Sequence, residues 1–164
     1  MNNIIDLSNL QSTDLDAGQV FSGKPSGTTV RGYAVPSAYT PAIDHDYLFH
    51  ESSRDVVVWF LNPQEPLYVF GPTGCGKTTC IKQLAARLNY PVFEVTGHGR
   101  LEFADLVGHL TVKDSNMAFE YGPLALAMRY GAIILLNEID LTSPEIAAGL
   151  NSVLDGSPLC IAEN

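Results

Sequence analysis

The chain has 164 residues, 46% of them hydrophobic, so it is long enough to form a domain with a hydrophobic core. Its formal net charge is −9, and its nine Lys and Arg residues are scattered singly, which argues against a nucleic-acid-binding surface. No apolar run approaches the roughly 20 residues of a membrane span. Three widely spaced cysteines predict neither a disulfide framework nor a zinc site. We therefore expect a cytoplasmic protein in a reducing compartment, with no nucleic-acid partner and no membrane contact.

The first 44 residues carry weak structural signals. Ser, Thr, Gly and Asn are frequent up to about residue 30 without a lasting hydrophobic period, which predicts a flexible arm. Residues 31–50 are rich in Tyr and Pro, which predicts an extended lead-in packed along a domain surface. Nothing holds the His and Asp residues of this lead-in at ligand spacing, so we interpret them as a solvated loop. They are Asp44, His45, Asp46 and His50.

A helix over residues 53–62 and a short strand over 67–70 are predicted next. Ser52 and Asp55 have the spacing of a capping box, and the wholly apolar middle of the helix predicts that it is buried. The apolar run 67–70 ends at Gly71, which is typical of a buried parallel strand.

A phosphate-binding loop follows this strand. Residues 71–78, GPTGCGKT, fit the pattern G-x-x-x-x-G-K-[ST] at every fixed position. Glycines allow backbone N–H groups to converge on an anion, and the helix predicted to follow, ending near Asn89, adds the positive end of its dipole. The predicted nucleotide-binding residues are Gly71, Pro72, Thr73, Gly74, Cys75, Gly76, Lys77, Thr78 and Thr79.

Two side chains of the loop carry its chemistry. Lys77 is predicted to reach the β- and γ-phosphates of ATP, and the Thr78 hydroxyl is predicted to bind Mg²⁺. We interpret Cys75, at a variable position of the pattern, as a tolerated residue rather than a reactive thiol.

The stretch from 91 to 130 predicts a strand, a hairpin and a helix. Residues 91–95 read as a second strand, followed by a loop in which His98 is interpreted as a solvated residue. Two short β-like runs around a polar turn predict an inserted hairpin near residues 107–121. Pro123 is suited to the first position of a helix that runs to about residue 130.

A continuous apolar run at 132–136 predicts a central parallel strand, and it ends at Asn137 and Glu138. In a phosphate-loop ATPase, the first of these positions helps to hold Mg²⁺ and the second activates the attacking water. Asn137 offers an amide oxygen but no charge, so Thr78 would carry more of the metal binding. Glu138 is the predicted general base.

The last predicted elements are a helix and a β segment. Pro144 follows two candidate cap residues, Thr142 and Ser143, and predicts a helix to about residue 154. Residues 159–162 read as the start of a further β segment.

Several segments together resemble the AAA+ ATPases of the MoxR group, in particular its CobS-like and NirQ/CbbQ-like branch. The segments are 71–78, 105–108 (DLVG), 119–124 (FEYGPL) and 135–140 (LLNEID), closed by 153–156 (VLDG). The loop alone indicates only a phosphate-loop protein, whereas the later segments in this order are much more specific.

The resemblance implies a P-loop NTPase of the α/β class, with three α/β/α layers, a parallel sheet and an inserted hairpin. Residues 1–44 would be an arm, and 45–164 a AAA+ core truncated before its sensor, arginine finger and lid. It implies Mg²⁺-dependent ATP hydrolysis by a ring, often a hexamer, that acts as a chaperone on a client protein, often with a von Willebrand factor A-type partner. By the same resemblance Lys77 and Glu138 are catalytic, and Thr78 and Asn137 bind the metal.

Three other functions stay open at this point. The chain could be a nucleotide-binding or interaction module without turnover of its own, because Asn137 supplies no charge. It could serve as a chelatase-type motor subunit. A small-molecule kinase would share the loop, but it would not call for the Asn137-Glu138 strand end or for the inserted hairpin.

Overall fold

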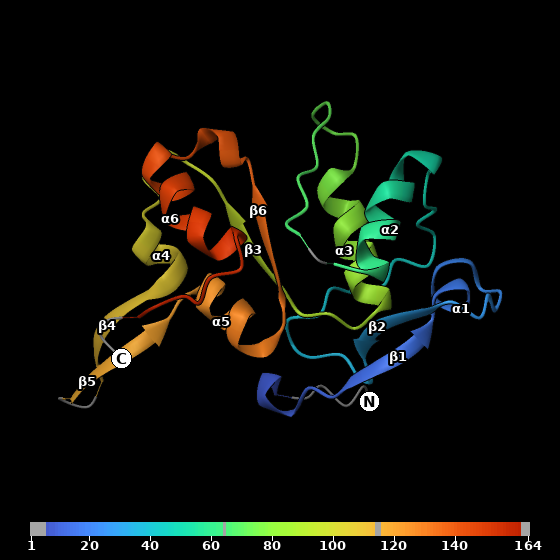
Figure 1. Ribbon diagram of the computed structural model, residues 1–164, viewed down its shortest axis with the longest axis horizontal. Coiled ribbons are helices and arrows are strands. Elements are labelled where there is room, and N and C mark those ends of the chain that lie inside the picture. The colour runs from blue at the N-terminus through green and yellow to red at the C-terminus, as the bar shows by residue number, and fades with distance from the viewer. Residues whose placement is uncertain (1–5, 64, 114–115, 162–164) are drawn as a thin grey trace. The chain divides into compact units, whose positions relative to one another are not determined.

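The structure is a computed structural model that describes residues 6–63, 65–113 and 116–161 (Figure 1). The chain divides into two compact units, residues 1–92 and 93–164, and each is considered by itself. Within the described ranges the structure is mixed α/β, and no helix of these ranges is long and apolar enough to cross a bilayer.

Regular structure occupies residues 12–33, where the sequence predicted a flexible arm. After a 3-10 turn, η1 (Leu7–Asn9), come β1 (Ser12–Asp16), α1 (Ala17–Ser22) and β2 (Thr29–Tyr33). β1 and β2 pair antiparallel. The Asp16 carboxylate accepts backbone N–H bonds from Gln19 and from Gly27, both at 2.8 Å, and so fixes the turn between the strands. Local hydrogen bonds therefore order a segment that has no hydrophobic period. The division of the chain at residue 45 stays a prediction.

Two longer helices of the first unit begin and end close to the predicted positions. They are α2 (Arg54–Leu61) and α3 (Lys77–Arg87). α3 contributes to the core, with Leu84 and Ala85 fully buried. α2 is less buried than its apolar sequence predicted, because a short helix packs with one side only. Phe60 is buried, whereas Val58 is 54% exposed.

α2 lacks the capping box predicted from Ser52 and Asp55. A 3-10 turn, η2 (Glu51–Ser53), precedes the helix, and the Ser52 N–H donates to His50 Nδ1 at 3.2 Å. Because Ser52 belongs to this turn, the helix begins after Ser53, whose side chain makes no capping bond.

The lead-in packs along α3, as predicted for an extended segment on a surface. The Gln83 side chain accepts from the Asp44 N–H at 2.9 Å and donates to the Ala42 carbonyl at 3.1 Å. One turn later, Arg87 donates to the Asp44 carbonyl at 3.1 Å and places its guanidinium 4.9 Å from the centre of the Phe49 ring. These contacts hold the second half of α3, and its first turn follows directly on the loop of residues 71–76.

The predicted strand at 67–70 is wrong, because none of the described strands includes or pairs with this segment. Its aromatic side chains are not buried: Tyr68 is 71% and Phe70 is 83% exposed, and their rings stack with centroids 6.4 Å apart. An apolar run forms a parallel strand only where neighbouring strands accept its hydrogen bonds.

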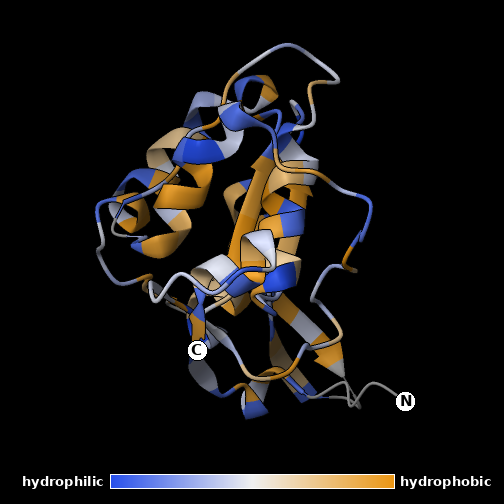
Figure 2. Cartoon of the chain, turned by 90° about the vertical axis from the view of Figure 1, so that its right-hand side faces the viewer, coloured by the Kyte–Doolittle hydropathy of each residue, from blue (hydrophilic) through white to orange (hydrophobic). Residues whose placement is uncertain are grey.

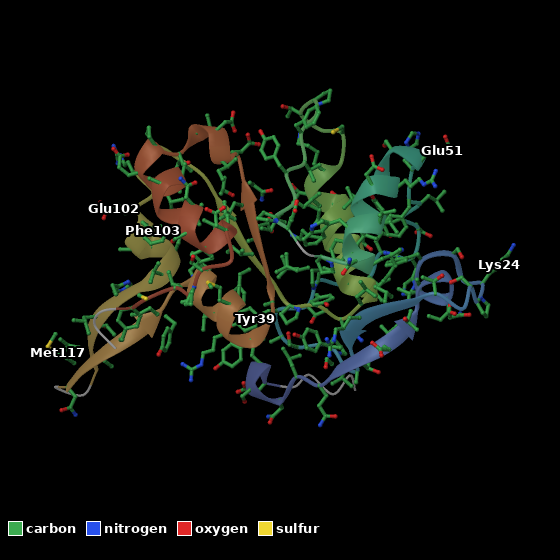
Figure 3. The ribbon with its side chains drawn as sticks, viewed as in Figure 1. Lys24, Tyr39, Glu51, Glu102, Phe103 and Met117 are labelled. Atoms are coloured by element: carbon green, nitrogen blue, oxygen red, sulfur yellow. The ribbon has the colours of Figure 1, made fainter. Side chains whose placement is uncertain are left out.

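The second unit contains the other predicted elements in the predicted order, with α4 and η3 in addition. They are β3 (Val92–Thr96), α4 (Phe103–Val107), β4 (Gly108–Lys113), β5 (Asn116–Tyr121), α5 (Pro123–Tyr130), β6 (Ile133–Asn137), η3 (Ile139–Leu141) and α6 (Pro144–Leu154). β4 and β5 form the predicted antiparallel hairpin, with Gly108 opposite Tyr121. Pro123 stands in the first turn of α5, as predicted. Met117 lies on β5 and is 71% exposed (Figure 3).

β3 and β6 are hydrogen-bonded neighbours that run side by side (Figure 1). Their parallel direction brings both carboxyl ends together: the Gly97 N–H, just after β3, donates to the Asn137 carbonyl at the end of β6 at 2.8 Å. The sheets of the described residues are all two-stranded, so the predicted three-layer arrangement around a larger sheet stays a prediction.

The core of the second unit lies between this strand pair and the helices. Its buried centre consists of Leu101, Leu106, Leu124, Ile146 and Leu150. Val95 of β3 and Ile134 and Leu136 of β6 pack against this centre, so helices cover one face of the pair. Figure 2 shows the strand ribbons near its middle in strongly hydrophobic colours. Because side chains alternate along a strand, Glu94 and Asn137 belong to the opposite face.

α6 approaches α4 closely because Gly149 has no side chain. A Cβ at Gly149 would come within 2.6 Å of the Phe103 ring, which is labelled in Figure 3. After α6, residues 159–161 do not form the predicted β segment, since none of the described strands pairs with them, and residue 162 lies outside the described residues. Leu159 packs against the core instead.

Candidate functional site

The loop before α3 adopts a backbone that requires glycine. Gly74 and Gly76 have φ of 79° and 85°, in the left-handed region that L side chains rarely adopt. A Cβ at either position would meet nothing within 4 Å. The left-handed backbone conformation, rather than a lack of space, therefore requires glycine at these positions. The motif that the sequence identified therefore forms the tight turn expected of a phosphate-binding loop.

Lys77, the first residue of α3, turns its side chain back into this loop. Its Nζ donates to the Gly71 carbonyl at 2.8 Å and to the Pro72 carbonyl at 2.9 Å. The ammonium thus lies within the curve of residues 71–76.

The amino end of α3 adds further donors. Gly76 is the N-cap residue, and no side chain caps the helix. The N–H groups of a helix's first turn have no intrahelical partner, and the helix dipole makes this end attractive to anions. Left-handed glycines, an uncapped helix end and a lysine ammonium are features that suit a phosphate group.

The remaining predicted nucleotide-binding residues lie in the same stretch. Thr73 and Cys75 are exposed in the loop, Thr78 is half-buried in the first turn of α3, and Thr79 is exposed. The Cys75 N–H donates to the Pro72 carbonyl at 3.4 Å, which helps to close the turn. All nine predicted residues from 71 to 79 lie close together, because they are consecutive in the chain.

The second group of predicted site residues lies at the end of β6. Glu138 is exposed and has φ 52° and ψ 43°, the left-handed conformation, which is uncommon for a residue with a side chain. Such strain persists only where the surroundings impose it, and it clusters at functional sites. β6 ends at Asn137, and the backbone turns sharply at Glu138 into η3.

Gly97 lies against this sharp turn, and the sequence analysis did not identify it. A Cβ at Gly97 would lie 2.4 Å from the Glu138 carbonyl oxygen and 2.7 Å from Thr142 Cγ2. Only glycine allows the chain after β3 to pass so close to the turn. Together with its bond to the Asn137 carbonyl, this contact fixes the backbone that carries Glu138.

Glu94 of β3 is the other residue that sequence reasoning missed. Its Oε1 accepts a hydrogen bond from Asn137 Nδ2 at 2.8 Å. A single acidic residue within the predicted strand 91–95 was the available signal, but its partner is 43 residues away and becomes a neighbour only through strand pairing.

The predicted residues therefore form two groups, 71–79 in the first unit and 137–138 in the second. Both groups offer ligands that suit Mg²⁺, which prefers oxygen donors: the Thr78 hydroxyl in one and the Asn137 amide in the other.

Other polar residues have structural roles. His98 is exposed, and its Nδ1 accepts from the Arg100 N–H at 3.2 Å, which fits the interpretation as a loop residue.

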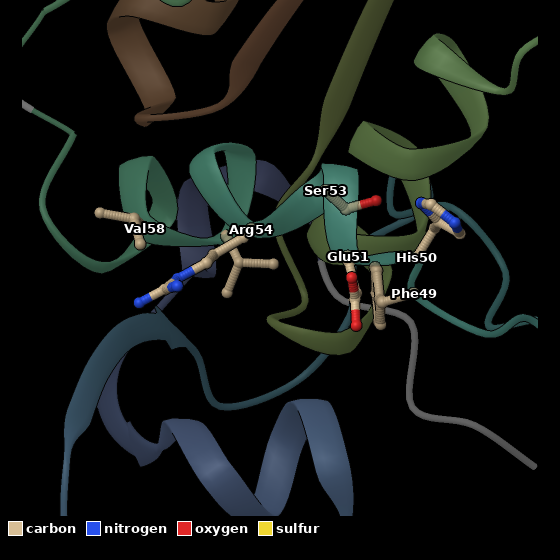
Figure 4. Close-up of a pocket in the computed structure, with 7 residues that line it drawn as sticks. Phe49, His50, Glu51, Ser53, Arg54 and Val58 are labelled. Carbon is tan, nitrogen blue, oxygen red and sulfur yellow. The ribbon is translucent and has the colours of Figure 1, made fainter.

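A pocket of about 710 Å³ lies along η2 and α2 (Figure 4). Its lining is Phe49, His50, Glu51, Ser53, Arg54, Val57 and Val58, and includes no described residue of the phosphate-binding loop.

Comparison with known proteins identifies a family and several relatives of this chain. Residues 66–164 match the family described as "AAA domain (dynein-related subfamily)". The aerobic cobaltochelatase subunit CobS of Sinorhizobium sp is 32% identical over 157 residues, which cover 93% of this chain and 47% of that protein. Protein NorQ of Paracoccus denitrificans is 38% identical over 90 residues, 55% of this chain and 33% of that protein. The gas vesicle ATPase GvpN of Ancylobacter aquaticus is 38% identical over 106 residues, 60% of this chain and 30% of that protein.

The chain spans about half or less of the length of these relatives. The matched family region contains both groups of predicted site residues.

Proposed function

This chain belongs to the MoxR-type AAA+ ATPases, within the dynein-related AAA subfamily, and we propose that it binds ATP with Mg²⁺ and hydrolyses the nucleotide in the cytoplasm. We propose further that hydrolysis is coupled to remodelling or activation of a partner protein. Residues 45–164 are the proposed ATPase core.

The loop before α3 is the observation that carries this proposal. Left-handed glycines, the uncapped end of α3 and the Lys77 ammonium against the Gly71 and Pro72 carbonyls make a cradle for phosphate oxygens. Lys77 would shift from these carbonyls to the β- and γ-phosphates when ATP binds, because phosphate is the stronger, charged acceptor.

Glu138 is the proposed general base. Its carboxylate would orient the attacking water and accept its proton, a role that a positioned acid performs in phosphate-loop ATPases. The support is its place at the end of β6, in a left-handed backbone conformation against which Gly97 lies closely. Thr78 and Asn137 are the proposed Mg²⁺ ligands. Mg²⁺, when bound, neutralises the charge that develops on the phosphate oxygens.

The proposed assembly is a ring, a hexamer, that acts as a chaperone on a client, with a von Willebrand factor A-type partner among the candidates. A chelatase-type motor subunit is the variant of this proposal that the cobaltochelatase relative favours, since that match covers 93% of the chain.

A second candidate function is nucleotide binding without turnover. Asn137 at the end of β6 favours it, because an amide contributes no charge to a metal site. Release of inorganic phosphate from ATP by the purified chain, abolished in Lys77→Ala, would exclude this candidate.

Calorimetric titration of ATP with Mg²⁺ into the chain tests the proposal. We expect Lys77→Ala to weaken binding about 10- to 100-fold, since a hydrogen bond to a charged group is worth roughly 1.5–3 kcal/mol. Lys24→Ala is the matched control, because Lys24 is exposed in the loop between α1 and β2 (Figure 3). An unchanged chain that binds no ATP, or equal binding by Lys77→Ala, would contradict the proposal.

A further inference from the structure

Glu94 is an exposed residue of β3, on the face opposite the one that packs against the buried centre of the second unit. Its Oε1 accepts a hydrogen bond of 2.8 Å from Asn137 Nδ2. The two side chains meet because β3 and β6 pair in parallel, which sets their carboxyl ends side by side.

This hydrogen bond fixes the orientation of the Asn137 amide. An ionised carboxylate only accepts hydrogen bonds, so the amide must present its nitrogen to Glu94. The Asn137 Oδ1 atom is then on the side of the amide away from Glu94. The main chain is held as well, because the Gly97 N–H donates to the Asn137 carbonyl at 2.8 Å. β3 and the residue after it therefore bind both the backbone and the side chain of Asn137.

The pair also carries a charge that Asn137 lacks. In phosphate-loop ATPases a carboxylate at this strand end helps to hold Mg²⁺. Here β6 ends with the amide of Asn137, and the Glu94 carboxylate is hydrogen-bonded to that amide. An amide whose nitrogen donates to a carboxylate is polarised, which makes its oxygen a better ligand for a cation.

We propose that Glu94 is a positioning residue of the metal site: it turns the Asn137 oxygen outward as a ligand for Mg²⁺ and supplies the negative charge that the amide does not. This inference rests on the proposed function, since it assigns a role in Mg²⁺-dependent ATP binding. Glu94 acts through Asn137 and through space, so its removal weakens the metal site without removing a ligand.

The test measures how much Mg²⁺ strengthens ATP binding, as the ratio of calorimetric affinities with Mg²⁺ and with EDTA. Glu94→Gln keeps the shape but removes the charge. The double variant Glu94→Gln with Asn137→Asp exchanges the two groups, so the amide now on β3 donates to the carboxylate now at the end of β6, and both charge and hydrogen bond return. Glu120→Gln, an exposed strand residue of the same unit, is the control for the loss of one charge.

We expect the ratio to fall about tenfold in Glu94→Gln, equivalent to about 1.4 kcal/mol, while ATP affinity in EDTA stays at the value of the unchanged chain. The exchanged variant recovers the ratio, and Glu120→Gln leaves it unchanged. A merely structural role for Glu94 would lower both affinities together and leave their ratio intact.

Two results overturn the inference and leave the proposed function standing: a ratio that is unchanged in Glu94→Gln, and an exchanged variant as weak as Glu94→Gln. Failure of the proposed function looks different, because the unchanged chain would then bind ATP in neither condition, and the inference would fall with it.

Discussion

The phosphate-binding loop and the end of β6 carry the two groups of site residues, and they are built in different ways. The loop is local: Lys77 bonds to carbonyls five and six residues earlier, and glycines within the motif provide the turn. The end of β6 depends on β3, because Glu94 and Gly97 hold Asn137 and Glu138 across the strand pair. A local site can be recognised in one sequence, whereas the surroundings of a non-local site become visible only after the chain has folded.

The largest expected effect is on the rate of ATP hydrolysis, and it tests Glu138 in the non-local group at the end of β6. We expect Glu138→Gln to lower the rate of ATP hydrolysis at least about 100-fold, since a general base contributes roughly 10²–10⁴ in rate. ATP binding should remain, because the loop that carries it is untouched. Phosphate release and calorimetry measure the two quantities. Glu145→Gln, in the exposed first turn of α6, is the control. Undiminished hydrolysis in Glu138→Gln would remove the assignment of the base.

The next effect tests the packing that supports Glu138. We expect Gly97→Ala to destabilise the protein by about 1–3 kcal/mol, because the new Cβ would lie 2.4 Å from the Glu138 carbonyl oxygen. The lower Tm should be accompanied by slower ATP hydrolysis. Gly99→Ala is the matched control two residues away, since a Cβ there meets nothing within 4 Å. Equal melting temperatures of the two variants would show that the close approach does not matter.

A smaller effect is expected in the local group. Gly74 has φ 79° but open space around it, so Gly74→Ala adds backbone strain without a clash. The left-handed conformation costs a residue with a Cβ about 1–2 kcal/mol. The Tm should therefore fall less than in Gly97→Ala. ATP affinity should also fall, because residue 74 would leave the left-handed conformation and change the shape of the loop. An equal loss of Tm in Gly74→Ala and Gly97→Ala would contradict the expectation that a steric clash costs more than an unfavourable backbone conformation.

The smallest effect concerns Asp16, another locally built feature. Backbone N–H bonds from Gln19, Ser26 and Gly27 to its carboxylate lower the pKa of Asp16 below its ordinary value of 3.8. A lowered folded-state pKa stabilises the fold above the unfolded pKa, and this stabilisation is lost as the pH falls through the folded pKa. We expect the Tm difference between the unchanged chain and Asp16→Asn to shrink below about pH 4. A difference that is constant between pH 6 and pH 2.5 would contradict this linkage.

Sequence reasoning placed most elements correctly where a local signal was strong. Pro123 and Pro144 marked helix starts, the apolar run before Asn137 marked β6, and the polar turn marked the hairpin. It failed at residues 67–70, because an apolar run says nothing about whether a neighbouring strand accepts its hydrogen bonds. It also missed the order in 12–33, where one aspartate and a few backbone bonds take the place of a hydrophobic period.

The sequence by itself determined the phosphate-binding loop, the helix that follows it and the acidic end of β6. Each depends on contiguous residues whose conformational preferences are set by glycine torsions, helix ends and apolar runs. Only the tertiary structure decided that Glu94 meets Asn137 and that Gly97 passes against Glu138. Those contacts arise from strand pairing between segments far apart in the chain, and a single sequence does not state which strands pair.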